Sequence, residues 1–138
     1  MSGASGPEDL PAEGGALDPE LVEIAHACFD LARAGETERL DLYVEHGLPA
    51  NLTDADGNTL LMLAAYHGHA DTVAMLLRRG ADPDRLNGRG QSPVAGALFK
   101  GEDEVVRLLV EAGADLDAGV PTARQAAEMF GRANLLDT

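Results

Sequence analysis

The chain has 138 residues, the length of one domain, and a hydrophobic fraction of 45%, so it is long and apolar enough to bury a core. Its net charge of −14 argues against nucleic acid or an anionic membrane as a partner, because both require cations on the protein. It lacks a run of apolar residues long enough to span a membrane, a secretory signal pattern and the cysteine pairs of a disulfide framework, which together predict a cytoplasmic protein.

The first segment, residues 1–17, is rich in glycine, proline and acids, and this composition predicts a flexible acidic tail. The tail either serves solubility or acts through its charge, by repelling wrong partners or attracting a basic one. A long helix is predicted next, with Asp18 as its cap and Pro19 as its first residue. Its apolar stripe is expected to comprise Leu21, Ile24, Ala25, Cys28, Leu31 and Ala32.

An internal repeat with a period of 33 residues governs the rest of the chain. This shift carries residues 57–59 (Gly-Asn-Thr) onto 90–92 (Gly-Gln-Ser). It also carries residues 80–82 onto 113–115, both of which are Gly-Ala-Asp. A fixed period of this size indicates a stacked array of small units, each held by its neighbours.

Each unit is predicted to contain two helices and a projecting loop. Thr59 is expected to cap a first helix that ends at Gly68, since a hydroxyl suits the cap and glycine suits a left-handed helix end. The second helix is expected to start near Asp71 and end at Gly80. Turn-forming residues then predict a loop, and the pattern restarts at the next cap, Ser92.

The last unit is predicted to be incomplete. Thr122 aligns with Thr59 at a shift of 63, so three residues are missing between Asp117 and Thr122 and the final loop is expected to be shorter. The predicted domain is residues 18–138, with units at approximately 18–53, 54–86, 87–119 and 120–138. The abundance of arginine, alanine and glycine is typical of a GC-rich bacterial genome.

The second unit carries a specific family pattern. Its segments Thr59-Leu60-Leu61-Met62-Leu63-Ala64-Ala65, Gly68-His69 and Gly80-Ala81-Asp82-Pro83 resemble the ankyrin repeat. The resemblance covers roughly residues 20–138. It implies an all-α solenoid of stacked helix-turn-helix units with projecting β-turn loops, about three full units plus a terminal partial unit. Met62 and Ala95 replace the histidine with which the family ties neighbouring turns.

The resemblance also implies a binding face, because the family holds partners on the inner face formed by the first helices and the loop tips. The expected partner-binding residues are Arg33, Tyr66, His67, Phe99, Lys100, Met129 and Phe130 on the helices, with Asp56, Asn58, Arg89 and Gln91 at the loop tips. Three of the five aromatic residues fall in this row. The alternative is that these rings pack partly against neighbouring units.

Catalytic, cofactor and metal sites are not predicted. Calcium spacing around Gly57 would place leucines at the first and last ligand positions, and Gly88-Arg89-Gly90 lacks the third glycine of a phosphate loop. His67 and His69 lack a third ligand nearby, and Cys28 and His26 face different sides of a helix.

The sequence therefore predicts a non-catalytic protein–protein interaction module, an adaptor that binds a protein partner through its concave face. The alternative is a small acidic regulator or inhibitor that occupies a basic site on an enzyme or a nucleic-acid-binding protein, as the charge of −14 would allow. The expected partner is another protein, without nucleic acid or membrane, and self-association is left open.

Overall fold

The computed structural model describes residues 19–137, so the predicted tail and the Asp18 cap lie outside the described residues. The described elements are α1 (Pro19–Ala34), α2 (Thr37–Glu45), α3 (Leu60–Tyr66), α4 (Ala70–Arg78), α5 (Pro93–Lys100), α6 (Asp103–Glu111), α7 (Ala123–Met129) and the 3-10 helix η2 (Ala133–Leu136). None of these helices is both long and apolar enough to cross a membrane.

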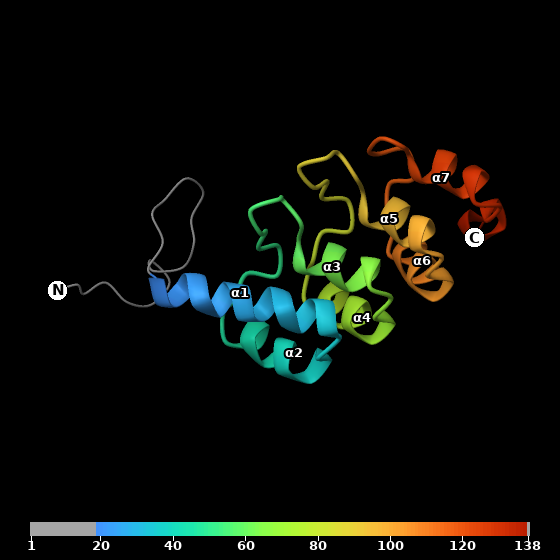
Figure 1. The fold of residues 1–138 in the computed structure, drawn as a ribbon. Coiled ribbons are helices and arrows are strands. Elements are labelled where there is room, and N and C mark those ends of the chain that lie inside the picture. Colours follow the sequence, from blue (N-terminus) through green and yellow to red (C-terminus); the bar gives the residue numbers. More distant parts are fainter. Residues whose placement is uncertain (1–18, 138) are drawn as a thin grey trace.

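The helices form a stack of pairs. The first helices α1, α3, α5 and α7 lie in one row, and α2, α4 and α6 lie in a second row behind it (Figure 1). The loops that join successive pairs all project on the same side of the stack (Figure 1). This arrangement confirms the expected all-α solenoid with projecting loops.

The first helices begin where the sequence predicts. The Thr59 hydroxyl accepts a hydrogen bond from the Met62 amide at 3.0 Å, and the Ser92 hydroxyl accepts one from the Ala95 amide at 3.1 Å. Thr122 caps α7 in the same way. Each hydroxyl satisfies an amide that has no partner within its own helix, which fixes the start of the helix.

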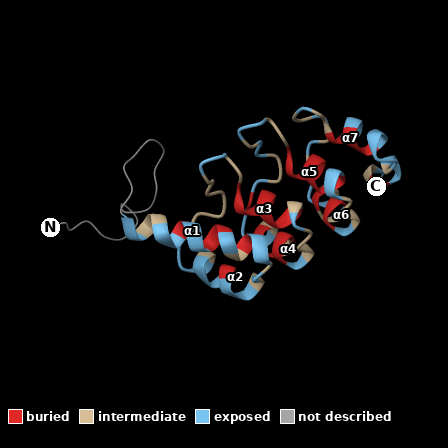
Figure 2. Ribbon diagram, in the orientation of Figure 1, coloured by how far each residue is buried: buried red, intermediate tan, exposed pale blue. Residues whose placement is uncertain are grey.

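The core runs through the first helices. Residues 60–65 of α3 and 93–98 of α5 are all buried, because each of these helices packs between two neighbours and its own second helix (Figure 2). The second helices bury one face only, and that face carries Val73 and Leu76 in α4 and Leu109 in α6. This one-sided burial is the pattern of a surface helix.

The predicted stripe of α1 was wrong in part. The buried residues of α1 are Ala25, Cys28, Phe29 and Ala32, whereas Ile24 is 38% exposed and Leu21 is only partly buried. In Figure 1 the first turns of α1 extend beyond α3, its partner in the row of first helices. The buried face keeps Ala25, Cys28 and Ala32 of the expected stripe and adds Phe29.

Loop length distinguishes the last unit. Residues 46–59 and 79–92 join the first two pairs of units with 14 residues each, whereas residues 112–122 join the last pair with 11. The predicted loss of three residues is therefore confirmed. Beyond α7 the last unit has the short η2 in place of a second α-helix, and Leu135 of η2 packs against the stack.

Polar side chains tie neighbouring loops together. Asn51 accepts a hydrogen bond from the Asp82 amide at 2.7 Å, and one unit later Asp84 accepts one from the Asp115 amide at 2.7 Å. The repeat shift of 33 residues carries the first bond onto the second. The loops are thus linked by a bond that recurs with the repeat.

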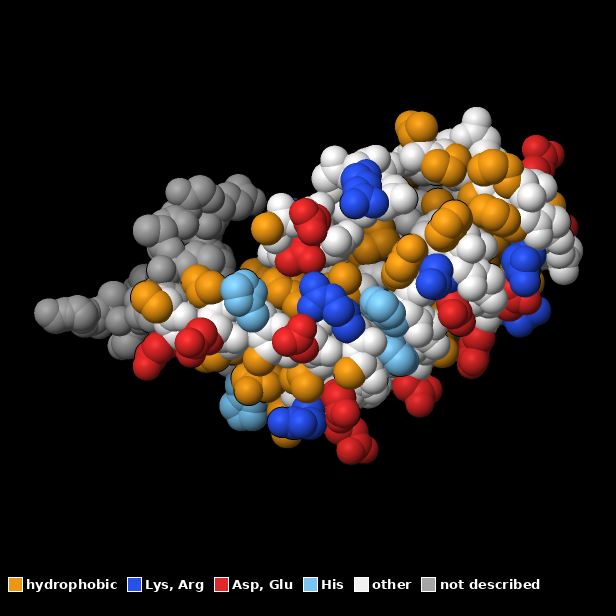
Figure 3. Space-filling model, viewed as in Figure 1, with side chains coloured by type: hydrophobic (Ala, Val, Ile, Leu, Met, Phe, Trp, Pro, Cys, Tyr) orange, Lys and Arg blue, Asp and Glu red, His pale blue; other side chains and the backbone are white. Residues whose placement is uncertain are grey.

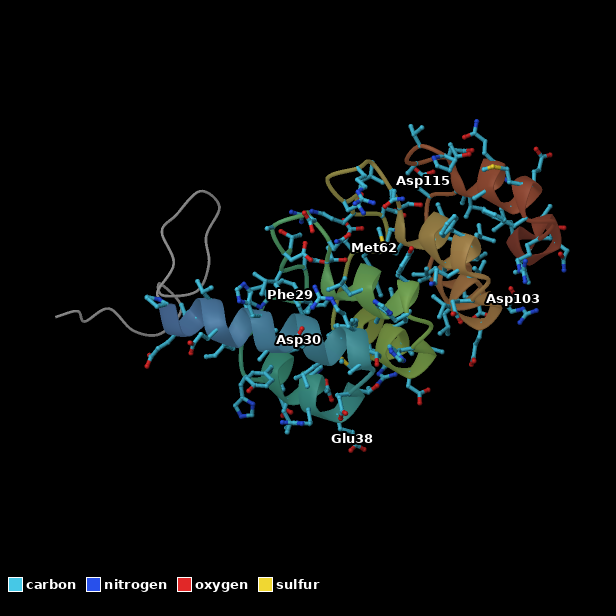
Figure 4. The ribbon with its side chains drawn as sticks, viewed as in Figure 1. Phe29, Asp30, Glu38, Met62, Asp103 and Asp115 are labelled. Carbon is cyan, nitrogen blue, oxygen red and sulfur yellow. The ribbon has the colours of Figure 1, made fainter. Side chains whose placement is uncertain are left out.

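The second helices are also joined by polar contacts. The hydroxyls of Thr37 in α2 and Thr72 in α4 are 2.6 Å apart. Arg79 Nε donates to Asp41 Oδ1 at 2.7 Å, and this hydrogen bond lowers the pKa of Asp41. At the C-terminal end of the stack, Arg132 Nε, just before η2, donates a hydrogen bond to Asp103 Oδ1 of α6 at 2.7 Å (Figure 4).

In the second, third and last units, the residue after the glycine that follows the first helix contacts the turn of the preceding unit. The side chain at this position differs in each of the three units. His69 Nε2 lies 2.7 Å from the Arg33 carbonyl oxygen, and because a carbonyl only accepts, this nitrogen carries the proton. In the next unit Glu102 holds the equivalent place, and its carboxylate lies against Gly68. In the last unit Arg132 does so, beside Gly101.

Candidate functional site

A groove of about 740 Å³ runs along the concave side of the stack. Its walls come from the inner helices α1, α3, α5 and α7 and from the loops that precede α3, α5 and α7. Figure 3 shows hydrophobic side chains gathered over α5 and α7, with Lys and Arg side chains bordering them. The helix row and the projecting loops therefore enclose a surface with both apolar and charged parts.

Most of the predicted binding residues meet in this groove. Ten of the eleven line it, namely Arg33, Asp56, Asn58, Tyr66, His67, Arg89, Gln91, Phe99, Met129 and Phe130. The eleventh, Lys100, stands beside them with its Nζ atom 5.0 Å from the centroid of the Tyr66 ring. A cation at this distance above an aromatic face is attracted by the ring.

The aromatic residues differ in how far they are exposed. Phe99 is 61% exposed and Phe130 is 36% exposed, and their rings meet edge to face with centroids 5.7 Å apart. Tyr66 is half-buried, and it lies close to Gly96 of the next unit. Packing against a neighbouring unit thus applies in part to Tyr66, while Phe99 remains open to solvent.

The loop tips hold themselves in shape. Asp54 Oδ1 accepts hydrogen bonds from the amides of Asp56 and Asn58, both at 2.9 Å. One unit later Asn87 Oδ1 accepts hydrogen bonds from the backbone amides of Arg89 and Gln91 in its own loop. The side-chain Nδ2 of Asn87 also donates to Asn58 Oδ1 at 2.9 Å. The second loop is thereby joined to the first, so both tips are positioned before any partner arrives.

Charged side chains concentrate where the first helices end. Arg33 pairs with Asp30 at 2.8 Å, and its other amino group lies 3.7 Å from Asp54 Oδ2. Next to it, His67 has its pKa lowered, first by desolvation and then by the charges of its cationic neighbours. The ends of the first helices therefore place the Arg33 guanidinium and the His67 imidazole along the groove, and the lowered pKa of His67 disfavours its charged form.

Sequence reasoning missed the residues that form the groove floor. They are Met62, Leu63, Ala95, Gly96, Pro121 and Ala126. A signal was available, since Gly96 stands where the neighbouring units have leucine and alanine. A small residue at an otherwise larger position marks a place where the inner surface is hollowed.

The other motifs have structural partners. Asp54 is engaged by its own loop, and His69 is bound to the backbone of the preceding unit. Gly88 donates its amide to the Asp56 carbonyl at 2.8 Å, which joins two loops. Cys28 is fully buried, and burial raises the pKa of its thiol to about 11, so the reactive thiolate is not formed at neutral pH.

The fold and the groove define a protein of stacked repeats, in which each unit contacts only its neighbours. A family model described as ankyrin repeats, in three copies, matches residues 27–119. That range is more than half of the chain, and the chain belongs to the ankyrin repeat family. Ankyrin repeats are generally protein–protein interaction modules and are typically non-catalytic.

Relatives cover parts of the chain. A Pseudomonas aeruginosa protein named as an ankyrin repeat protein is 54% identical over 59 residues, which are 43% of this chain and 34% of that protein. A Treponema pallidum protein named as ankyrin repeat-containing is 35% identical over 101 residues, 69% of this chain and 34% of that protein. Serine/threonine-protein kinase 12 of Arabidopsis thaliana is 35% identical over 114 residues, 80% of this chain and 25% of that protein. The chain thus spans about a third or less of these curated relatives.

Proposed function

We propose that the chain binds a protein partner through its concave groove. The observation that carries this proposal is the pair Phe99–Phe130, two contacting aromatic rings that remain exposed inside a groove with preformed loop tips. Met129, 64% exposed, extends the same apolar surface. Exposed apolar clusters of this kind mark interaction sites, and aromatic residues most often anchor interfaces. The proposal assigns the chain no reaction.

The test starts with the native partner, recovered from the source cell with the full chain as bait and identified by mass spectrometry. The variant Tyr66→Ala with Phe99→Ala is then compared with the unchanged chain. Loss of each ring should weaken partner binding by at least ~2 kcal/mol, the usual size of an interface anchor. A folded double variant that binds its partner as tightly as before would contradict the proposal, and so would a variant that unfolds, since the rings would then belong to the core.

A matched control uses exposed apolar residues outside the groove. Leu42 and Tyr43 of α2 are 56% and 41% exposed and do not line the groove. The variant Leu42→Ala with Tyr43→Ala should bind the partner with unchanged affinity. Equal losses in the two double variants would indicate a general effect of removing surface apolar groups.

A second candidate function follows from the charge of −14, since so acidic a chain could occupy a basic site on an enzyme or a nucleic-acid-binding protein. Attraction between exposed charges is screened by salt, whereas apolar anchoring is much less affected. Binding to the native partner that falls steeply with salt and ignores the aromatic variant would favour this acidic regulator over the groove-binding module.

A further inference from the structure

The groove differs in charge from the protein as a whole. The chain carries a net charge of −14, yet among residues 19–137 only two acids, Asp54 and Asp56, line the groove. Two arginines, Arg33 and Arg89, line it as well, and Lys100 stands beside them above the Tyr66 ring. Cations therefore outnumber acids on this one surface.

The Asp54 carboxylate is engaged by groups of the protein itself. Its Oδ1 atom accepts two backbone hydrogen bonds at 2.9 Å, its Oδ2 atom faces Arg33 at 3.7 Å, and its side chain is only 13% exposed. By contrast, Arg89 and Lys100 take part in none of the ion pairs among residues 19–137. Two exposed cations are thus opposed by the single exposed carboxylate of Asp56.

These cations lie beside the apolar surface. Lys100 follows Phe99 directly in the chain, so a cation and an apolar anchor share the end of one helix. Arg33 lies at the end of the first helix α1, and the imidazole of His67 follows the end of α3. Two further acids lie nearby, namely Asp30, which pairs with Arg33 at 2.8 Å, and Glu102, whose carboxylate lies against Gly68.

We propose that the partner segment held in this groove is acidic and carries a large apolar side chain. The apolar side chain packs against Phe99, Met129 and Phe130, and a neighbouring carboxylate is paired by Lys100 or Arg89. A basic segment would instead meet two cations that have no ion-pair partner of their own, which disfavours it. This inference rests on the proposed function and adds the chemistry of the partner.

The test is selection of a displayed library of random peptides on the full chain. The selected peptides should be enriched in Asp or Glu next to Phe, Leu or another large apolar residue. Enrichment in Lys or Arg, enrichment in apolar residues without acids, or no enrichment would overturn the inference. So would a dimer of the chain that Phe99→Ala dissociates and that excludes the peptides, because the groove would then belong to a second copy.

Charge-reversal variants locate the contact. A selected peptide, synthesised with a fluorophore, is titrated with Arg89→Glu combined with Lys100→Glu. The matched control is Arg78→Glu with Arg107→Glu, which changes the net charge equally at exposed residues of α4 and α6 outside the groove. The groove variant should weaken binding at least about tenfold at low salt, and the control less than about twofold. Equal weakening by both would overturn the inference.

The neutral variant Arg89→Gln with Lys100→Gln should also weaken binding of the peptide. It replaces the charge-reversed variant in the titration if that variant does not fold. The variant Tyr66→Ala with Phe99→Ala separates the two proposals. If this aromatic variant binds the selected peptide normally, groove binding itself fails. If it loses a peptide that is basic, only the charge inference fails.

Discussion

In the inner helices α3 and α5, the first residues and the last residues differ in burial. In α5, residues 93–98 are all buried, whereas Phe99 is 61% exposed and Lys100 is also exposed. In α3, residues 60–65 are buried and Tyr66 is half-buried. In these two helices the first residues contact the neighbouring helices and also form the groove floor, as Met62 and Gly96 do, whereas the exposed rings and the Lys100 charge come from the last residues. The packing of the stack and the exposed groups of the groove therefore reside in different residues of the same short helix.

The largest expected effect comes from two adjacent residues of α5. Leu98 is fully buried, so Leu98→Ala should lower the free energy of unfolding by about 2–5 kcal/mol, the cost of a core cavity. Phe99→Ala should lower it by about 1 kcal/mol or less, because the ring is mostly exposed and loses chiefly its contact with Phe130. Urea unfolding measures both. Similar losses of unfolding free energy in the two variants would contradict the assignment of stability to the buried residues of α5.

A smaller effect is expected at the cap of α3. Thr59 is 1% exposed and its hydroxyl accepts the Met62 amide, so Thr59→Ala should cost about 1 kcal/mol of stability by leaving that amide unpaired. Thr59→Ser keeps the oxygen and should recover most of the loss. If the alanine and serine variants unfold at the same urea concentration, the hydroxyl does not stabilise the helix start.

A gain is expected at Gly96, in the middle of α5. A Cβ atom there would lie 3.6 Å from Met62 Sδ and from Tyr66 Cδ1, which is ordinary contact. Gly96→Ala should therefore raise the unfolding free energy by about 0.5–1 kcal/mol through helix propensity. Gly101→Ala is the control, because its φ of 74° is left-handed and alanine there should destabilise. A loss of stability in Gly96→Ala would show that the groove floor has no room for a methyl group.

The smallest effect concerns pH and the exposed end of α3. Burial, with help from His69, Lys100 and Arg33, lowers the pKa of His67 below its ordinary 6.5. The unfolded chain therefore binds this proton before the folded one, and stability falls as pH falls below 6.5. The side chain is exposed, so the change should be roughly a few tenths of a kcal/mol.

Urea unfolding of the chain and of His67→Gln, compared above and below pH 6.5, isolates this contribution. The variant should show a smaller fall in stability on acidification than the unchanged chain. An identical fall in both would indicate that other groups carry the pH dependence. The same protonation adds a cation to the groove, so acidic peptides should bind more tightly over this range until their own carboxylates protonate.

The repeat could be predicted from the sequence because local chemistry dictates it. Thr59 and Ser92 cap helices, and the three-residue gap before Thr122 shortens a loop, whichever neighbours surround them. The row that contains Tyr66 and Phe99 followed from the same register, because equivalent positions of stacked units line up.

The features that the sequence did not predict depend on how the units are placed relative to one another. Ile24 satisfies the helical pattern of α1 but is exposed, because the pattern of one helix does not show which of its turns face a neighbouring helix. The groove floor at Gly96 depends on how closely α3 and α5 approach. The bond from Asp82 to Asn51 crosses between units, although the recurrence of both polar residues 33 positions later was a usable sign.

The position that touches the preceding turn has a consequence for the order of the units. His69 offers a proton to the Arg33 carbonyl, whereas Glu102 occupies the same place one unit later with a carboxylate. If the second and third units were exchanged, that carboxylate would face the Arg33 carbonyl, acceptor against acceptor, and the bond would be lost. Units of nearly the same shape are thus not equivalent, because the donors and acceptors at each junction match only the unit that precedes it in this chain.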